Sequence, residues 1–128
     1  MKCFIVDDNQ LYIDIITHAI STPNDIIKST TNPHEAIEQI IEFYPDVIVI
    51  DFVMPDISGT QLAERIKNVD QIKHIPIILI SAGDIPRDFN RYGIDDYIEK
   101  SESVETMKKS LELFSNIGKI NKHVKKMR

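Results

Sequence analysis

Short, wholly apolar runs alternate along the chain with longer segments in which apolar residues recur every three or four positions. Runs of the first kind predict buried strands, and segments of the second kind predict amphipathic helices. The predicted strands cover residues 3–6, 25–30, 47–50, 75–80 and 96–99. The predicted helices cover residues 10–20, 32–44 and 58–69, a short and weak segment at 85–92, and a strong helix that follows Lys100. Five alternations of strand and helix predict an α/β fold, a doubly wound five-stranded parallel sheet with helices on both faces.

The apolar stripes of two helices decide how the chain is divided. In the helix at 10–20, the spacing of Leu11, Ile15 and Ala19 predicts the face that packs on the core. The last helix has a predicted inner stripe of Val104, Met107, Leu111 and Phe114, and apolar residues continue at Ile117, Ile120, Val124 and Met127. We therefore expect one domain at 1–115 and a basic C-terminal helix extension or linker at 116–128.

The extension has two interpretations. Gly118 interrupts its apolar stripe, and a glycine inside a helix costs roughly 1 kcal/mol, so we expect a frayed, solvated helix end. The alternative is a short basic amphipathic helix that pairs with a second protomer, an acidic partner or a membrane surface.

Composition and charge narrow the class of protein. The chain has 128 residues, of which 42% are hydrophobic and 27% charged, as in an ordinary single globular domain. No apolar run reaches the length of a membrane span, and the N-terminus turns acidic too soon for a signal peptide. The single cysteine, Cys3, excludes an internal disulfide, and we expect a buried thiol and a cytoplasmic setting.

The charge is divided unevenly. Through Glu112 the chain has ten basic and 20 acidic residues, a net charge of -10, and the five later charged residues are all basic. An acidic body argues against a direct nucleic-acid surface on the domain.

The side chains that follow the strands carry the candidate chemistry. They are Asp7 and Asp8 after the first strand, Asp51 after the third, Ser81 after the fourth and Lys100 after the fifth. The carboxyl ends of parallel strands meet at one edge of a sheet, so we expect these groups to converge there. Crowded carboxylates repel one another, and Mg²⁺, which binds carboxylate and phosphate oxygens, relieves that repulsion. Together with a lysine and a hydroxyl for phosphate oxygens, the set predicts a phosphoryl-transfer site with Asp51 as the nucleophile.

Five stretches define this edge and the loops beside it: Val6-Asp7-Asp8-Asn9, Val47-Ile48-Val49-Ile50-Asp51, Met54-Pro55-Asp56-Ile57-Ser58-Gly59, Ile80-Ser81-Ala82 and Asp96-Tyr97-Ile98-Glu99-Lys100. In this order and spacing they resemble the receiver domain of two-component response regulators, over nearly the whole chain. The resemblance implies a flavodoxin-like sheet in the order 2-1-3-4-5 and a phosphoprotein of a two-component or phosphorelay signal transduction system. It implies a histidine kinase or histidine phosphotransfer protein as phosphoryl donor and an output protein or domain as a second partner. A homodimer is a further expectation.

The resemblance also implies roles at the carboxylate cluster. Asp51 would be the phosphoacceptor. Asp8, Asp51 and the backbone carbonyl of Val53 would hold Mg²⁺, with Asp7 acting through water. The ordinary alternative is that Asp7 and Asp8 form a helix-capping pair.

Three further residues receive roles from the resemblance. Ser81 and Lys100 would bind the phosphoryl oxygens, and Tyr97 would turn inward when Ser81 moves toward the phosphate. Each also has an ordinary explanation, since Ser81 suits a turn, Lys100 a solvated strand end, and Tyr97 a half-buried position in a strand.

The chain departs from the family pattern in two places. Ser101 follows Lys100 where the family usually has proline after a cis bond. A cis bond before another residue costs about 2.5–4 kcal/mol, so we expect a trans bond and a rearranged loop. The segment 81–97 is about one helical turn short, in the fourth helix, which puts the usual output face in question.

In the family that the chain resembles, the positions two beyond the acceptor and two beyond Ser81 tune how water reaches the phosphoryl group. In this chain they are Val53 and Gly83. Neither side chain orients water, so we expect slow self-dephosphorylation. We do not expect the protein to be an enzyme with repeated turnover. The alternative function is an Mg²⁺-dependent phosphohydrolase with an aspartyl-phosphate intermediate, although Phe52 and Val53 stand where a second acid would be needed. A third interpretation is a flavodoxin-like nucleotide-binding protein. It is disfavoured because no Gly-rich or Ser/Thr-rich phosphate loop follows the first strand of this chain. The histidines are interpreted as surface or packing residues: His18, His34, His74 and His123.

Overall fold

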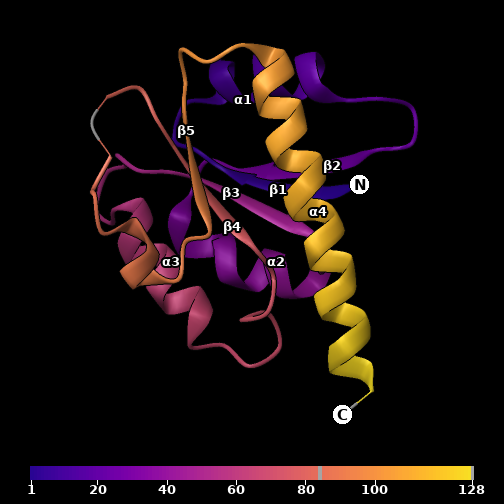
Figure 1. The fold of residues 1–128 in the computed structure, drawn as a ribbon. Helices are drawn as coiled ribbons and strands as arrows, with labels where there is room; N and C mark the ends of the chain where they lie inside the picture. The colour runs from indigo at the N-terminus through magenta and orange to yellow at the C-terminus, as the bar shows by residue number, and fades with distance from the viewer. Residues whose placement is uncertain (84, 128) are drawn as a thin grey trace.

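Five parallel strands form the centre of the molecule in the order β2-β1-β3-β4-β5 (Figure 1), which confirms the predicted sheet. The coordinates are a computed structural model that describes residues 1–83 and 85–127; Asp84, at the end of the predicted turn after strand 4, and Arg128, in the basic extension, lie outside the described residues. The strands are β1 (Lys2–Val6), β2 (Ile26–Thr30), β3 (Val47–Asp51), β4 (Ile77–Ser81) and β5 (Asp96–Glu99). Every residue of β3 and β4 is buried, as expected for strands covered on both faces.

Helices cover both faces of the sheet (Figure 1). The α-helices are α1 (Gln10–Ile20), α2 (Ala36–Phe43), α3 (Gly59–Lys67) and α4 (Val104–Lys126), and two short 3₁₀ turns are η1 (Pro33–Glu35) and η2 (Phe89–Tyr92). Side chains of β3 alternate between the two cores: Ile48 and Ile50 pack toward α2 and α3, whereas Val47 and Val49 pack toward α1 and α4. None of the helices in the described part of the chain is long and apolar enough to cross a membrane.

The inner face of α1 differs from the prediction. The buried residues are Ile13, Ile16 and Ile20, whereas Leu11 and Ile15 are exposed. The helix carries two apolar stripes of similar spacing, and the packing of α1 against the sheet and α4 selects one of them. The predicted stripe of α4 is also wrong at its first residue, because Val104 is exposed in the first turn of the helix.

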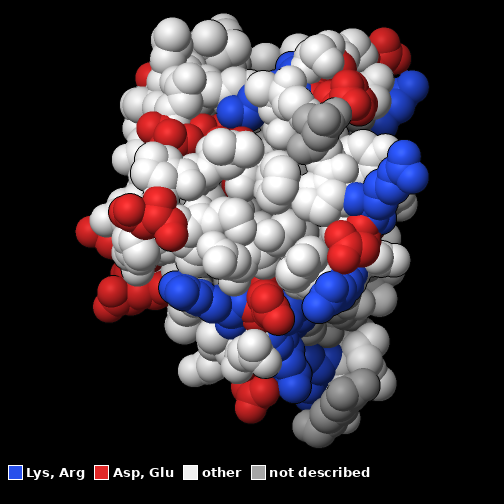
Figure 2. All heavy atoms as spheres, turned by 90° about the vertical axis from the view of Figure 1, so that its left-hand side faces the viewer, with Lys and Arg blue, Asp and Glu red and all other residues white. Residues whose placement is uncertain are grey.

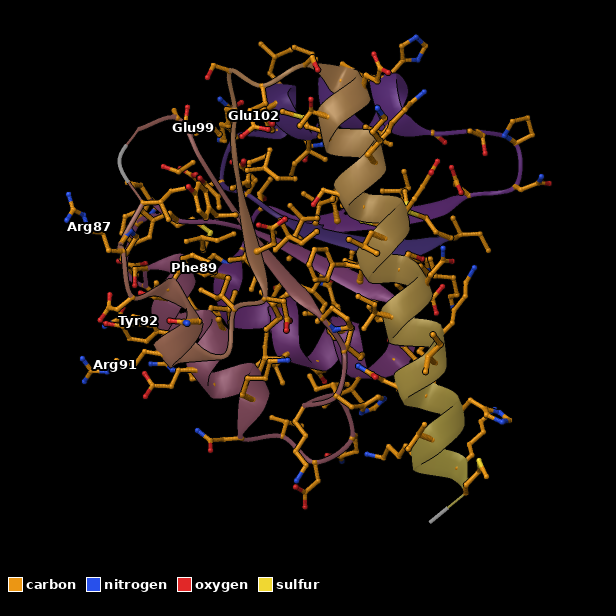
Figure 3. The ribbon with its side chains drawn as sticks, in the orientation of Figure 1. Arg87, Phe89, Arg91, Tyr92, Glu99 and Glu102 are labelled. Carbon is orange, nitrogen blue, oxygen red and sulfur yellow. The ribbon has the colours of Figure 1, made fainter. Side chains whose placement is uncertain are left out.

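The segment between β4 and β5 is short, as predicted. Of its described residues, only Phe89–Tyr92 form a helical turn, which is of 3₁₀ type, and none of them belongs to an α-helix. Figure 3 shows Arg87 and Arg91 extending away from the body of the protein, whereas Phe89 and Tyr92 pack against the core that lies beneath α3. Figure 2 shows the side of the molecule that carries this segment, and few charged side chains occupy the middle of that face.

The C-terminal helix is continuous, and the predicted frayed end is wrong. Helix α4 runs through Gly118 to Lys126, so the expected division between 115 and 116 falls within it. A Cβ at Gly118 would collide with the backbone carbonyl of Asp46, so glycine allows the helix to approach the start of β3. Lys122 forms an ion pair with Asp46 at 2.9 Å. The end of the helix is thus fastened to the amino-terminal edge of the sheet.

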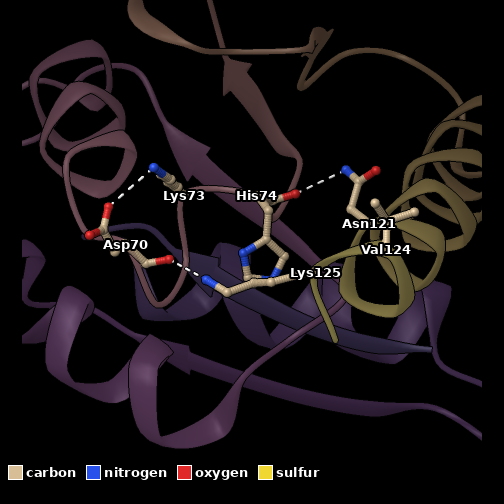
Figure 4. Close-up of a pocket in the computed structure, with 6 residues that line it drawn as sticks. All are labelled: Asp70, Lys73, His74, Asn121, Val124 and Lys125. Carbon is tan, nitrogen blue, oxygen red and sulfur yellow. Dashed lines mark hydrogen bonds and ion pairs between the residues drawn. The ribbon is translucent and has the colours of Figure 1, made fainter. Parts of the chain in front are cut away.

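Two more contacts hold this end of α4 (Figure 4). The Asn121 amide donates to the carbonyl oxygen of His74 at 3.0 Å, and the Lys125 ammonium donates to the carbonyl oxygen of Asp70. Together with Lys73 and Val124 these residues line a pocket of about 460 Å³. Two lysines of the extension, Lys122 and Lys125, are therefore engaged by the body of the protein.

Candidate functional site

Three carboxylates converge at the carboxyl-terminal edge of the sheet, as the order of the strands requires. Asp7 follows β1 directly, Asp8 is the next residue, and Asp51 ends β3. One carboxylate oxygen of each lies within 4.8 Å of the others. Asp7 is 0% and Asp51 5% exposed, whereas Asp8 is open to solvent. This spacing suits a small cation that binds several carboxylate oxygens at once.

Lys100 closes the cluster from β5. Its ammonium lies 2.8 Å from Asp7 Oδ2 and 3.5 Å from Asp51 Oδ1. The backbone N–H of Lys100 donates to the carbonyl of Ser81 at 2.8 Å, which extends the pairing of β4 and β5 by one residue. The lysine thus reaches the acids from a strand that is held in register with the central part of the sheet.

No peptide bond of the described residues is cis, so the predicted trans bond before Ser101 is confirmed. The backbone N–H of Glu102 donates to the carbonyl of Glu99, and the Glu102 carboxylate accepts from the N–H of Glu99 at 3.3 Å. Both glutamates lie next to this edge of the sheet in Figure 3. This tight turn holds the backbone on both sides of Lys100.

The environment of Asp51 alters its acidity. Burial, the neighbouring carboxylate of Asp7 and that of Asp8 raise the pKa of Asp51 from 3.8 to about 7, against the opposing effect of Lys100. Burial disfavours the ionised form, and like charges disfavour it further. The site therefore favours a cation, or a proton, beside Asp51.

The loop after β3 holds the backbone of Asp51. Met54 and Ile57 are buried and anchor the loop on the core. Ser58 begins α3 with a capping box in which Gln61 takes part. A Cβ at Gly59 would collide with the carbonyl oxygen of Asp51, so the close approach of α3 to the site requires glycine.

The remaining predicted residues lie around this cluster. Ser81 follows Ile80, the register partner of Asp51, and its buried hydroxyl accepts from the N–H of Gly83 at 3.2 Å. Val53 is 69% exposed beside Asp51. Ser81 is thus enclosed in the protein, whereas Val53 lies at the solvent boundary.

Tyr97 lies outward in this structure. It is partly exposed, and its ring packs against Phe89 of η2 in a T-shaped arrangement, with ring centroids 5.2 Å apart. The short segment that replaces the fourth helix therefore contacts the predicted switch residue directly.

Tyr12 is a further residue of the site, which the sequence pattern did not predict. The Lys100 ammonium lies 4.2 Å from the centre of the Tyr12 ring, within cation–π range. The Tyr12 hydroxyl is buried without a hydrogen-bond partner, and burial together with the charges of Asp7 and Asp51 raises its pKa to about 12. Its position five residues after Asp7, on the inner side of α1, is the only sequence signal for this placement.

The histidines lie away from the carboxylate cluster, in line with their interpretation as surface or packing residues. His34 forms a long ion pair with exposed Asp56, and His74 accepts or donates a hydrogen bond of 2.8 Å with the hydroxyl of Tyr44 at the opposite edge of the sheet. Burial, with the lysines nearby, lowers the pKa of His74 to about 4.

Comparison with known proteins gives one consistent result. The family model described as response regulator receiver domain matches residues 3–112. The polar-differentiation response regulator DivK of Brucella anthropi is 32% identical over 114 residues, which cover 84% of this chain and 93% of that protein. DivK of Brucella abortus is 31% identical over the same length.

Solved structures agree on the fold. The receiver domain of the Vibrio parahaemolyticus putative LuxO repressor superposes with a TM-score of 0.84 at 21% identity, covering 96% of this chain and 95% of that one. The chemotaxis protein CheY4 of Vibrio cholerae superposes with a TM-score of 0.80 at 22% identity, covering 88% and 97%. At this level of identity the likeness establishes the fold alone.

Proposed function

Because the chain belongs to the response regulator receiver domain family, we propose that it is the phosphoacceptor of a two-component or phosphorelay system, with Asp51 as the acceptor. The observation that carries the proposal is the buried Asp51 carboxylate at the end of the central strand, with Asp7, Asp8 and Lys100 around it. A structural carboxylate at a strand end needs neither two acidic neighbours nor an ammonium that bridges two of them.

The proposed step is a phosphoryl transfer from a phosphohistidine of a kinase or phosphotransfer protein. A carboxylate oxygen of Asp51 attacks phosphorus, the P–N bond to the donor imidazole breaks, and its electron pair remains on the imidazole nitrogen. The product is an acyl phosphate on Asp51. Lys100 and Ser81 bind phosphoryl oxygens and stabilise the charge that develops on them.

The residues present fit Mg²⁺, since three carboxylate oxygens already lie within 4.8 Å of one another. Asp8 and Asp51 would bind it directly, the carbonyl of Val53 would complete the protein ligands, and Asp7 would act through water. When bound, Mg²⁺ supplies positive charge to the phosphoryl oxygens and offsets the repulsion among the acids.

The proposed output is a change at Tyr97. When Ser81 turns toward the phosphoryl group, it leaves room into which the Tyr97 ring can move from its outward position on Phe89. Movement of Tyr97 would then alter the face formed by β5 and η2, and so the affinity for an output protein or domain. We place this signalling in the cytoplasm, where donor and acceptor meet.

The phosphohydrolase alternative has no structural support in the described residues. Such an enzyme needs an acid close after the nucleophile, and the exposed aliphatic Val53 occupies that place. A slow, single loss of the phosphoryl group is the behaviour we expect, without turnover.

The direct test is phosphorylation by acetyl phosphate in the presence of Mg²⁺, read by intact mass on the wild type and on Asp51→Asn. We expect a gain of one phosphoryl group, about 80 Da by the chemistry of the transfer, on the wild type alone. No gain on the wild type, or an equal gain on the variant, would overturn the assignment.

A further inference from the structure

Helix α4 has a second apolar face, which is largely exposed to solvent. The residues that pack on the domain are Met107, Leu111, Ser115 and Gly118. Five apolar residues lie on another side of the helix, from its tenth residue to its C-cap: Leu113, Ile117, Ile120, Val124 and Met127. All but Ile117, which is partly buried, are among the exposed large hydrophobic residues of the protein. We name these five residues the outer stripe.

The outer stripe has the spacing of a coiled-coil seam. Its successive members are four, three, four and three residues apart, which is a heptad repeat. In that repeat Ile117 and Val124 take the a positions, and Leu113, Ile120 and Met127 take the d positions. β-Branched residues at a and Leu at d are typical of parallel two-stranded coiled coils, and here both a residues are β-branched and the first d residue is Leu113. We propose that the outer stripe pairs with the outer stripe of a second copy of this chain, in a parallel two-helix dimer.

The geometry of α4 leaves room for such a dimer. At 100° per residue, Ile120 is turned by about 160° from Gly118, so the outer stripe points away from the face that packs on the sheet. In the dimer the two domains therefore lie on opposite outer sides of the helix pair. The Asp51 cluster, at the far end of the strands, remains open.

The side chains that border the outer stripe are compatible with a second α4 helix as its binding partner. The e and g positions between Leu113 and Met127 are Phe114, Asn116, Asn121 and His123, none of which carries a fixed charge. Two identical helices therefore bring no fixed like charges together along the seam.

The lysines of α4 offer a membrane few contacts. A surface helix in a membrane needs free lysines at the border of its apolar face. Of the four lysines after residue 115, Lys122 is paired with Asp46 and donates to the carbonyl of Tyr44, and Lys125 donates to the carbonyl of Asp70, which leaves Lys119 and Lys126 as an exposed pair outside these contacts. The same bonds orient α4 so that the outer stripe is presented to solvent.

Two heptads bury less surface than a standard stable interface, so we expect a weak dimer with a dissociation constant of about 10–100 μM. Sedimentation equilibrium of the whole chain, from about 5 μM to about 1 mM, measures this dissociation constant.

Ile120→Lys should weaken the dimer at least about tenfold, since it places a charge in the centre of the seam. The matched control is Ile15→Lys on α1, because the two isoleucines are 61% and 59% exposed. The control should dimerise as the wild type does.

A cysteine pair tests the register. In a parallel dimer Val124 faces Val124 of the second copy, so Val124→Cys should form a disulfide-linked dimer on mild oxidation with copper–phenanthroline, whereas Lys119→Cys, outside the seam, should not. Burial raises the pKa of the native Cys3 thiol to about 12, which keeps it unreactive.

Two sedimentation results would overturn the proposal: a wild type that stays monomeric at about 1 mM, well above the expected dissociation constant, or an equal loss of dimer in Ile15→Lys and Ile120→Lys. Cross-linking of Lys119→Cys but not of Val124→Cys would also overturn it. So would a monomer that binds vesicles of anionic lipid through the outer stripe. The proposal does not depend on phosphorylation of Asp51, and these measurements need no phosphoryl donor.

Discussion

The protonation state of Asp51 contributes to the stability of the protein. Its pKa is raised from 3.8 to about 7 by burial and by Asp7 and Asp8. The folded state therefore holds a proton that the unfolded state releases at lower pH. The stabilisation that this proton gives is complete below about pH 4 and is lost as the pH rises through about 7.

Asp51→Asn should remove this pH dependence. In a chelating buffer without Mg²⁺, we expect the variant to be more stable than the wild type above about pH 7, by about 1 kcal/mol, because water in the open site screens part of the repulsion. The difference should shrink toward pH 4. Urea unfolding of both proteins at several pH values measures it, and a difference that is constant with pH would contradict the raised pKa.

Tyr12 supports Lys100 through its ring. Tyr12→Leu removes the cation–π contact, so phosphorylation by acetyl phosphate should slow by about three- to tenfold. Tyr12→Phe keeps the ring and removes only the unpartnered hydroxyl, so its rate should stay within about twofold of the wild type. Equal slowing in both variants would assign the effect to the hydroxyl. Thermal unfolding of both variants separates a local effect on Lys100 from loss of the fold.

We expect Val53 to control how water reaches an acyl phosphate on Asp51. Its exposed aliphatic side chain has no group that orients water. The phosphorylated wild type should therefore decay slowly, with a half-life of many minutes, and Val53→Asn should shorten it by about tenfold through a positioned water. Intact mass at timed intervals after removal of the donor follows the decay. A wild-type half-life of seconds would refute this account.

Among the elements, the parallel strands were the most predictable, because an unbroken apolar run such as 47–50 fits only a strand that is buried on both faces. Helices with two apolar faces were not predictable in the same way. In α1 the spacing selects Leu11 and Ile15 as readily as Ile13 and Ile16, and only packing against the sheet decides between them. The end of α4 was mispredicted because Gly118 suggests a break until the carbonyl of Asp46 is seen beside it.

In the candidate site, too, the residues placed by strand order were predictable, and those placed by helix packing were not. Strand order alone brings Asp7, Asp8 and Asp51 together, so topology was sufficient to predict their convergence. The position of Tyr12 beneath Lys100 depends on how α1 turns about its axis, which the sequence pattern did not determine. The outward position of Tyr97 likewise depends on its contact with Phe89, in the segment between β4 and β5.

Gly118 tests how closely α4 must approach the sheet. Alanine favours a helix over glycine by about 1 kcal/mol. At this position, however, the added Cβ would collide with the carbonyl of Asp46. We expect Gly118→Ala to destabilise the protein by about 1–3 kcal/mol, as overpacked substitutions do. Gly83→Ala is the control, since no atom lies within 4 Å of its added Cβ, and its stability should change by less than about 0.5 kcal/mol.

At the scale of the whole molecule, the candidate site and the contacts that fasten α4 lie at opposite ends of the strands. The acids of the candidate site gather where the strands end, and Lys122 and Lys125 contact the loops at the opposite edge. Binding and oligomerisation are thus assigned to different ends of one rigid sheet. A cation at one end should stabilise the entire fold, because it binds only the folded arrangement of the three acids.

Mg²⁺ should raise the melting temperature of the wild type. At tenfold excess over its dissociation constant the gain is about 1.4 kcal/mol, or about 5 °C for a chain of this length. Asp8→Asn should abolish most of the gain without harming the fold, because Asp8 is exposed. Asp70→Asn, an exposed acid paired with Lys73 at the opposite edge, should keep the full gain. An equal gain in both variants would mean that Mg²⁺ acts through the acidic surface in general, because a site built from the strand ends must distinguish the two aspartates.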